Sequence, residues 1–338
     1  MTSQAIKLPA VKEQTSSSAN KVVGAAALLA LLGLAFSLPF WGEAYWMHEF
    51  VTIACYFIFA VMWNLLAGYG GMVSVGQQAY FGIGGYTLIA LGNLGGMNPF
   101  LAIPIAALSA ALLAWPLSKI AFRLSGGYFA IGTWVIAEVV RLTVANINAV
   151  GGGSGTSLTA FRGMDRSFRQ FGTYWIALAA VCLTLLLIYL FLRSKQGLAL
   201  QAIRDSEVAA ESQGIDVKKM KLMVYIVAAF GCGIAGSLFF VNNLRISPDA
   251  AFSVSWTAFG IFIIMIGGIG RIEGAIFGTL IFWAVDHFFS DYGTWYLIGL
   301  GSLAIVMTLV APKGIAGVLH VRFSWELFPT KRVFSPTK

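Results

Sequence analysis

The chain has 338 residues, of which 58% are hydrophobic and 11% are charged. An average soluble domain is about a quarter charged, so this chain has too few charges to cover a soluble surface of its size. The formal net charge of +8 does not indicate a nucleic-acid-binding protein, because the basic residues lie in short segments between apolar runs and form no continuous basic face with interleaved aromatic residues.

The N-terminal segment, residues 1–21, is polar and Ser-rich and carries Lys7, Lys12 and Lys21. An apolar run follows directly and extends to Phe40. A cleaved signal peptide has a shorter apolar core that ends in a small-x-small cleavage site. We therefore expect a cytoplasmic N-terminal tail, followed by a first membrane helix that is retained.

Apolar runs close to the length that crosses the hydrocarbon core of a bilayer recur along the rest of the chain. They span residues 22–41, 48–66, 74–92, 99–119, 126–146, 172–192, 219–243, 254–270, 275–290 and 294–311. The sequence thus predicts an all-α integral membrane protein with about ten transmembrane segments, some broken at Gly-rich points, and a membrane domain over residues 22–313. The runs at 254–270 and 275–290 also fit one long helix, bent around the glycines at 267–270.

The basic residues favour ten crossings over nine, because Lys and Arg in short loops stay on the cytoplasmic side of a membrane. With ten crossings and a cytoplasmic N-terminus, most of the 22 Lys and Arg residues fall on the cytoplasmic side. A single helix over residues 254–290 would place the basic tail at residues 314–338 outside. Both termini are therefore expected in the cytoplasm, and the C-terminal tail is expected to form either a short interfacial helix or a disordered segment.

Glycines are concentrated at a few places in the chain, one of which is residues 68–85. Broken backbone at membrane depth is tolerated where protein or water satisfies its polar groups. Four uncharged polar residues, Ser74, Gln77, Gln78 and Tyr80, stand among these glycines, which favours a discontinuous helix beside a pore. Close packing of helices through small residues is the alternative explanation.

Several apparent motifs do not indicate chemistry. Residues 231–236 match the GxGxxG pattern, but they lie inside an apolar run without a preceding strand, so helix packing explains them better than dinucleotide binding. No GxxxxGKS or GxxxxGKT motif occurs, so ATP, if it drives the protein, must bind another subunit. His48, His287 and His320 are far apart in the sequence, and we expect neither a catalytic residue nor a metal site.

Two charges, Glu138 and Arg141, lie within the fifth apolar run. Their spacing places them on one face of a helix, where they can pair. Charges at membrane depth are costly and usually face the interior of a bundle. The pair is expected either to fix helix packing near the end of the span or to contact a substrate directly.

The longest expected cytoplasmic loop, residues 193–221, carries a helical pattern around Ala202, Ile203, Ala209 and Ala210 and a glycine at its end. Such a segment suits a short helix that lies across the membrane surface and presents small residues to the groove of a partner. We interpret it as a docking segment for a partner.

This loop resembles the coupling helix of ABC importer permeases, whose signature is EAA followed by three residues and Gly, and we therefore call residues 193–221 the coupling loop. Ala209, Ala210 and Gly214 match the signature, whereas Val208 stands where Glu is expected and Glu207 lies one position earlier. The residues that the resemblance implies for coupling to an ATPase are Gly197, Ala202, Ile203, Glu207, Ala209, Ala210 and Gly214.

The resemblance covers most of residues 50–318. Its blocks, in the order in which the family has them, are residues 64–86, 127–133, Glu138 with Arg141, 152–155, 266–270 and 311–317. Taken together they resemble the branched-chain amino acid ABC transporter permeases of the LivM type, a family of hydrophobic amino acid uptake. The chain departs from that pattern at Gly76 and Gln77, where the family often has Gly-His.

The resemblance implies a permease bundle of the bacterial inner membrane that forms half of the pore of an ATP-driven importer for branched-chain, or other hydrophobic or small, amino acids. The implied partners are a second homologous permease, two cytoplasmic ABC ATPases that bind the ATP, a periplasmic substrate-binding protein and membrane lipid. No cofactor bound by the chain itself, no enzymatic activity and no nucleic acid are expected. The candidate residues of the substrate passage are Ser74, Gln77, Gln78, Tyr80, Thr133, Glu138 and Arg141.

Other functions stay open at this point. Similar permeases admit urea or short amides in place of amino acids. An ion-coupled secondary transporter also uses broken helices, but it needs membrane-embedded carboxylates for the coupling ion, and Glu138 is the one good candidate in the sequence. An integral-membrane enzyme needs His, Asp or Ser side chains clustered at one depth, and the sequence suggests no such cluster.

Overall fold

A computed structural model describes residues 18–311, 313–323 and 328. The expected N-terminal tail up to residue 17 and most of the C-terminal tail beyond residue 323 lie outside the described residues. Within them the chain is a bundle of helices, and two short strands, β1 (Thr156–Ser157) and β2 (Arg245–Ile246), form an antiparallel pair. The predicted all-α membrane fold is confirmed.

The long helices are α1 (Ser18–Trp41), α2 (Ala44–Asn64), α4 (Pro99–Ala121), α5 (Gly127–Ala145), α6 (Arg166–Arg193), α9 (Val217–Asn243), α12 (Ile272–Phe289) and α13 (Thr294–Val310). The shorter ones are α3 (Gln78–Asn93), α7 (Lys195–Asp205), α8 (Glu207–Ser212), α10 (Pro248–Ala251), α11 (Val254–Gly267) and α14 (Gly314–Phe323). A π-helical turn, η1 (Leu65–Tyr69), continues α2, and 3-10 turns occupy Asn148–Val150, Gly152–Ser154 and Ser290–Tyr292.

Eight helical segments of the described chain are long and apolar enough to cross a membrane. Helices also occupy the two remaining predicted segments, but the described apolar part of α1, Leu29–Trp41, and the 16-residue α3 are shorter than a full crossing. The number of ten crossings therefore stays a prediction. The alternative of one long helix over 254–290 is wrong, because α11 and α12 are separate helices that pack against each other across a turn at 268–271.

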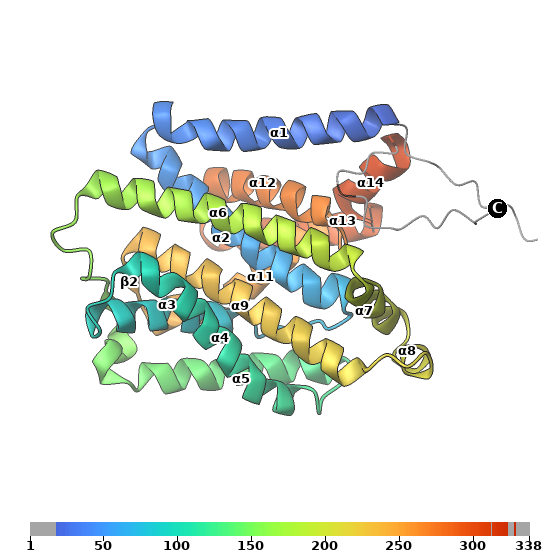
Figure 1. Cartoon of the computed structure of the whole chain (residues 1–338), viewed down its shortest axis with the longest axis horizontal. Helices are drawn as coiled ribbons and strands as arrows, with labels where there is room; N and C mark the ends of the chain where they lie inside the picture. The colour runs from blue at the N-terminus through green and yellow to red at the C-terminus, as the bar shows by residue number, and fades with distance from the viewer. Residues whose placement is uncertain (1–17, 312, 324–327, 329–338) are drawn as a thin grey trace, which may run out of the picture.

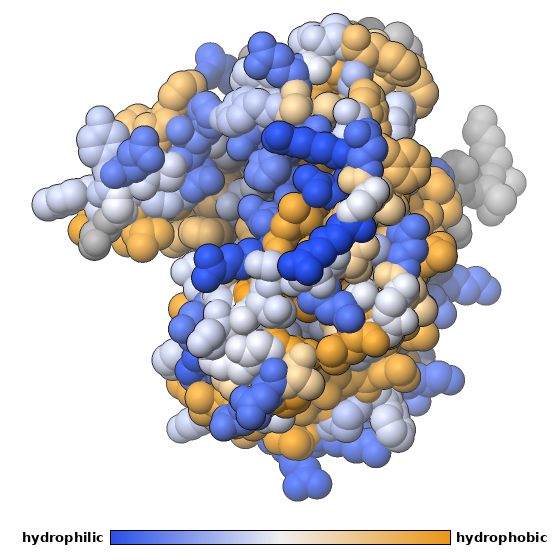
Figure 2. Space-filling view, turned by 90° about the vertical axis from the view of Figure 1, so that its left-hand side faces the viewer, coloured by the Kyte–Doolittle hydropathy of each residue, from blue (hydrophilic) through white to orange (hydrophobic). Residues whose placement is uncertain are grey.

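Loops gather at two opposite ends of the bundle (Figure 1). One end carries α7 and α8, and we call it the coupling-loop end. The opposite end carries the paired strands β1 and β2, and we call it the sheet end. Seen from the sheet end, hydrophilic side chains gather over the middle of the molecule and apolar ones form much of its margin (Figure 2).

The bundle contains two similar units that run in opposite directions. In the first, α2 leads into α3, α4 and α5; in the second, α9 leads into α11, α12 and α13. The helices α5 and α13 are both preceded by a glycine with the same positive-φ backbone conformation, Gly126 (φ 58°, ψ −132°) and Gly293 (φ 57°, ψ −122°). Because α2 starts at the sheet end and α9 starts at the coupling-loop end, the units form an inverted repeat, an arrangement common in transporters.

The two units exchange their first helices. Helix α9 packs against α3 and α4 of the first unit, and α2 packs against α11 and α12 of the second. Neither unit is therefore complete without the leading helix of the other, which makes the described bundle a single core.

Small residues allow the closest of these contacts. Along α4, Ala102, Ala106, Ala110 and Ala114 are fully buried. A Cβ on Gly233 of α9 would lie 2.8 Å from the Cβ of Ala110, so the glycine lets the two backbones approach. The GxGxxG pattern at 231–236 thus serves helix packing, as the sequence predicted.

Candidate functional site

A break in the first helical unit lies between α2 and α3. After η1 the chain leaves helical geometry, and residues 71–77 are non-helical before α3 begins at Gln78. Neighbouring side chains satisfy this backbone: the indole of Trp63 donates to the carbonyl of Ser74 at 2.9 Å, and the amide of Val75 donates to Thr133 Oγ1 at 3.1 Å. The predicted discontinuity within residues 68–85 is present, and protein groups satisfy part of its backbone.

The polar side chains of this segment point into the bundle. Ser74, Gln77, Gln78 and Tyr80 are each at most 1% exposed in the single chain, as is Thr133. The outer side of the segment is formed instead by other residues, among which Val73 is 47% exposed.

Each of these side chains has a partner within the chain. The Ser74 hydroxyl accepts the amide of Gly76 at 3.2 Å and the side-chain amide of Gln77 at 3.4 Å. Tyr80 donates to the hydroxyl of Tyr225 on α9 at 2.8 Å. The first unit is thereby held to α9 by buried hydrogen bonds.

The same local geometry recurs before α11 of the second unit. The Ser253 hydroxyl accepts the amide of Ser255 at 3.2 Å, as the Ser74 hydroxyl accepts that of Gly76. Four residues beyond each serine stand Gln78 and Thr257, and the Thr257 hydroxyl donates to Gln78 Oε1 at 2.5 Å. This bond joins equivalent positions of the inverted repeat, so the pseudo-two-fold axis passes close to it, between two half-helices of opposite direction.

The predicted ion pair on α5 is present and has a third member. Arg141 Nε lies 3.0 Å from each carboxylate oxygen of Glu138, and its Nη1 lies 2.5 Å from Asp249 Oδ1. Asp249 belongs to α10, the short helix that precedes the half-helix α11. The side chains of Glu138 and Asp249 are 46% and 80% exposed, so the pair lies on the bundle surface toward the sheet end and ties α5 to the second break.

The coupling loop folds as a hairpin of α7 and α8. Hydroxyl groups of Ser194 and Ser206 cap the two helices by accepting the amides of Gly197 and Ala209. Gly214 ends α8 in a left-handed conformation (φ 81°) and is followed by a bond from the amide of Ile215 to the carbonyl of Ala210 at 3.1 Å, the pattern of a Schellman cap.

The predicted coupling residues divide into two groups. Ile203 and Ala210 are buried and pack with Val217 inside the hairpin, and Gly197 is buried against the end of α6, with Ala202 partly buried beside this cluster. Glu207, Ala209 and Gly214 are exposed, as are Val208, Glu211 and Ser212. The first group holds the shape of the hairpin, and the second is accessible to a partner.

Arg204 connects this hairpin to the broken helix. Its Nη1 donates to the carbonyl of Gly68 in η1 at 3.0 Å, and its Nε and Nη2 donate to Asp205 Oδ1 at 3.1 and 3.0 Å. The π-helical turn leaves carbonyl groups without helical partners, and a cation is favourable at such a helix C-terminus. The sequence did not point to Arg204, because its partner is a backbone carbonyl 136 residues away.

Asn64 makes a second connection at the same end. Its Oδ1 accepts the amide of Gly270 at 2.8 Å, and its Nδ2 donates to the carbonyl of Arg271 at 3.0 Å. A Cβ on Gly68 would lie 2.6 Å from the amide nitrogen of Gly270, so the glycines at both places permit the contact. The end of α2, the α11–α12 turn and α7 therefore meet at one point.

A cavity of about 550 Å³ opens beside this point. Its lining includes Gly71 and Val73 of the broken segment, Phe129 of α5, and Glu207 and Lys221 of the coupling loop and α9. Lys221 Nζ lies 2.5 Å from Glu207 Oε1 across it. The cavity thus places the exposed side of the broken segment next to the coupling loop. Among the described residues no group of three or more His, Cys, Asp or Glu side chains is arranged to hold a metal ion.

An inverted repeat, an interrupted helix in each unit and a hairpin on one end together define a membrane transport protein. The family model described as "Branched-chain amino acid transport system / permease component" matches residues 48–311, and the chain belongs to this family. It is a multi-pass membrane permease of an ABC importer and not an enzyme.

Relatives with assigned roles agree with this family. The chain is 28% identical to the high-affinity branched-chain amino acid transport system permease protein LivM of Escherichia coli, over 85% of the chain and 74% of that protein. It is 27% identical to a probable LivM of Methanocaldococcus jannaschii, over 67% of this chain and 75% of that protein. It is 28% identical to a probable LivH of the same organism, over 72% of this chain and 82% of that protein. No solved structure matches the chain.

Proposed function

We propose that the chain forms half of the translocation pathway of an importer for branched-chain amino acids and that the exposed side of α7 and α8 receives a cytoplasmic ABC ATPase. The observation that carries this proposal is the contact from Arg204 of the hairpin to the Gly68 carbonyl in the broken helix. A movement of the hairpin would be transmitted through this contact to the broken segment, whose backbone lacks helical hydrogen bonds.

The proposed complex contains a second, homologous permease, two ATPase subunits that bind the ATP, and a periplasmic substrate-binding protein. Its membrane is the bacterial inner membrane, with the coupling-loop end and both termini in the cytoplasm. The distribution of charge supports this orientation, since Lys119, Arg204, Lys218, Lys221 and Arg271 lie at the coupling-loop end.

The broken segment provides the proposed gate. Ser74, Gln77, Gln78, Tyr80 and Thr133 are enclosed in this structure, so an amino acid would meet them only after α3 and α11 separate. The bond between Gln78 and Thr257 is the natural point of separation, because it joins the two half-helices where their units meet. ATPase movement would then exchange this enclosed state for one in which the polar groups face the passage.

The arrangement of Glu138 disfavours an ion-coupled secondary transporter. Both carboxylate oxygens lie 3.0 Å from Arg141 Nε, so the carboxylate is already neutralised by a cation of the same helix. A coupling ion would have to displace that partner in each cycle.

Reconstitution of the permease pair with its ATPases and binding protein in liposomes tests the proposal. We expect uptake of radiolabelled leucine, isoleucine or valine that requires ATP on the ATPase side and is unaffected by a collapsed proton or sodium gradient. Uptake driven by an ion gradient without ATPase subunits would refute the ATP-driven mechanism. ATP-dependent uptake of urea or a short amide, with no uptake of these amino acids, would refute the proposed substrate alone.

A further inference from the structure

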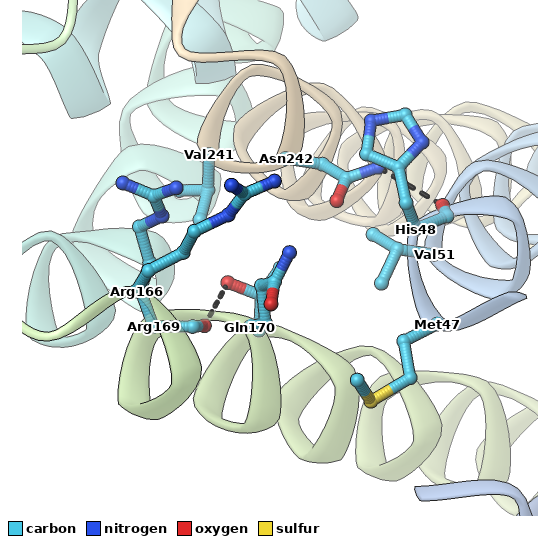
Figure 3. A pocket seen from close by; sticks show the side chains of 9 residues that line it. Met47, His48, Val51, Arg166, Arg169, Gln170, Val241 and Asn242 are labelled. Carbon is cyan, nitrogen blue, oxygen red and sulfur yellow. Dashed lines mark hydrogen bonds between the residues drawn. The ribbon is translucent and has the colours of Figure 1, made fainter. Parts of the chain in front are cut away.

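A second, smaller cavity lies at the sheet end, between the start of α2, the first turns of α6 and the end of α9. It has a volume of about 160 Å³ and is partly open to the surface. Figure 3 shows the guanidinium groups of Arg166 and Arg169 extending from α6 toward Val241 and Asn242, with the Gln170 side chain beside them. No part of the proposed translocation or coupling mechanism uses these residues.

The cavity carries positive charge that the chain does not neutralise. No acidic residue lines it, and among the described residues neither Arg166 nor Arg169 forms an ion pair. Both arginines also belong to the first turn of α6, whose N-cap is Asp165. Cations near a helix N-terminus are unfavourable, because the helix dipole is positive there. An anion between the two guanidinium groups would neutralise their charge and would also interact favourably with the positive end of the helix dipole.

The polar part of the lining is held in place by hydrogen bonds within the chain, and the two arginines supply its donors. Asn242 is fixed by its side-chain amide, which donates to the carbonyl of His48 at 3.1 Å, and the backbone of Arg169 is fixed by the hydroxyl of Thr173, which donates to its carbonyl at 2.9 Å. Arginine presents its N–H groups in a planar fork that suits the oxygens of a phosphate. The Gln170 side chain adds an amide within the same cavity.

The surroundings of the cavity match the headgroup level of a bilayer. Trp41, Tyr45 and Trp46 are exposed at the turn from α1 to α2, and Phe168 is exposed on the first turn of α6. Exposed aromatic residues of this kind mark the membrane–water interface. Farther along α6 the exposed residues are Leu183, Leu186, Leu187 and Leu190. A phospholipid whose phosphate lies at the arginines would therefore find an apolar helix surface for its acyl chains.

We propose that the cavity bounded by Arg166, Arg169, Gln170, His48 and Asn242 binds the headgroup phosphate of an anionic phospholipid. Thr173 and the apolar residues Met47, Val51 and Val241 complete the lining, and the apolar side chains accommodate the carbon atoms next to the phosphate. Two guanidinium groups favour a headgroup with a net negative charge over a zwitterionic one, whose own cation would be repelled.

The test is binding of phosphatidylglycerol to the delipidated full chain in detergent, measured by native mass spectrometry. We expect the Kd to rise about tenfold or more when Arg166→Gln and Arg169→Gln are combined, because two charge-assisted contacts are lost. Arg162→Gln is the matched control: it removes the same charge from the preceding loop but not from the cavity, and we expect a change below about twofold. Without lipid, the double variant should unfold at the same or a higher temperature, because it removes cations from a helix N-terminus.

Several results would overturn the proposal. An equal loss of binding in Arg162→Gln would show a diffuse basic surface. Equal affinity of the unsubstituted chain for phosphatidylcholine would show that negative headgroup charge is not selected. Saturation and stabilisation by inorganic phosphate alone, with no added effect of phosphatidylglycerol, would assign the cavity to a free anion. Unchanged lipid binding together with weaker docking of the binding protein in the double variant would assign the arginines to a protein contact.

Discussion

Replacing Arg204 by Gln is expected to weaken the transfer of movement from the coupling loop to the broken helix. The substitution removes the guanidinium that donates to the Gly68 carbonyl at 3.0 Å and leaves that carbonyl to water at the edge of the cavity beside it. A hydrogen bond from a charged donor contributes about 1.5–3 kcal/mol. The side chain of Arg204 is 40% exposed, so solvent screening reduces this to about 1 kcal/mol.

That free energy corresponds to about a fivefold change in the equilibrium between the hairpin held against η1 and the hairpin released from it. The assay is the ratio of amino acid imported to ATP hydrolysed in proteoliposomes that contain the whole transporter. We expect Arg204→Gln to lower this ratio severalfold while ATP hydrolysis continues, because the substitution leaves the proposed docking surface on the exposed side of α8 unchanged.

Two further variants separate coupling from general damage. Arg204→Lys keeps the charge but not the forked geometry shared between Gly68 and Asp205, so a partial recovery of the ratio is expected. Lys219→Gln removes an exposed charge from the same end of the molecule and should leave the ratio unchanged. An Arg204→Gln transporter that imports as much amino acid per ATP as the unsubstituted one would refute the reasoning.

Three other substitutions have expected outcomes of different kinds. Gly214→Trp places a side chain on a residue with φ 81°, so the cap of α8 is lost at a cost of about 1 kcal/mol or more. We expect weaker binding of the ATPase. Membrane insertion, measured by membrane fractionation, should be unchanged. Gly84→Ala drives a Cβ into the backbone of Gly233, and the detergent-solubilised chain should unfold at a clearly lower temperature, with a loss of about 1–3 kcal/mol. Arg141→Gln breaks the contacts to Glu138 and Asp249. Because the side chains of these partners are 46% and 80% exposed, the free energy of unfolding should fall by at most about 1 kcal/mol. A strong loss of uptake in a variant that is still folded would indicate that Arg141 contacts the substrate.

The positions of the helices were readable from the sequence because lipid imposes a local requirement. Each apolar run has to satisfy its own backbone hydrogen bonds, so length and composition alone mark the helices. The break after α2 was readable for the same reason: a cluster of glycines with Ser74, Gln77 and Gln78 contradicts a plain lipid-facing helix, and the structure indeed leaves helical geometry there.

The partners of the charged residues were not readable, because they are set by tertiary packing. Glu138 was found from its spacing to Arg141, whereas Asp249 lies 108 residues from Arg141 in a helix of four residues. Arg204 contacts a backbone carbonyl, which has no sequence signature at all. Ala210 matched the coupling signature, yet it is buried within the hairpin, so a sequence match does not distinguish residues that shape the loop from residues that a partner touches.

The inverted repeat was also missed, since the matching segments Ser74-Val-Gly-Gln-Gln-Ala and Ser253-Val-Ser-Trp-Thr-Ala are short, share only Ser, Val and Ala, and lie far apart in the chain. The structure shows what they share physically: a serine that accepts the amide two residues later, at the start of a half-helix. Backbone geometry of this kind tolerates wide changes of side chain.

The two breaks are held by different arginines at opposite ends of the molecule. Arg204 holds the break before α3 at the coupling-loop end, and Arg141, through Asp249, holds the segment before α11 at the sheet end. A transporter that exposes its passage to one side at a time needs two closures that do not open together. Only the first arginine belongs to the coupling loop, so an ATPase that moves this loop acts directly on the closure at its own end. In the proposed mechanism the closure at the sheet end follows through the contacts between the two units, one of which is the buried bond between Gln78 and Thr257.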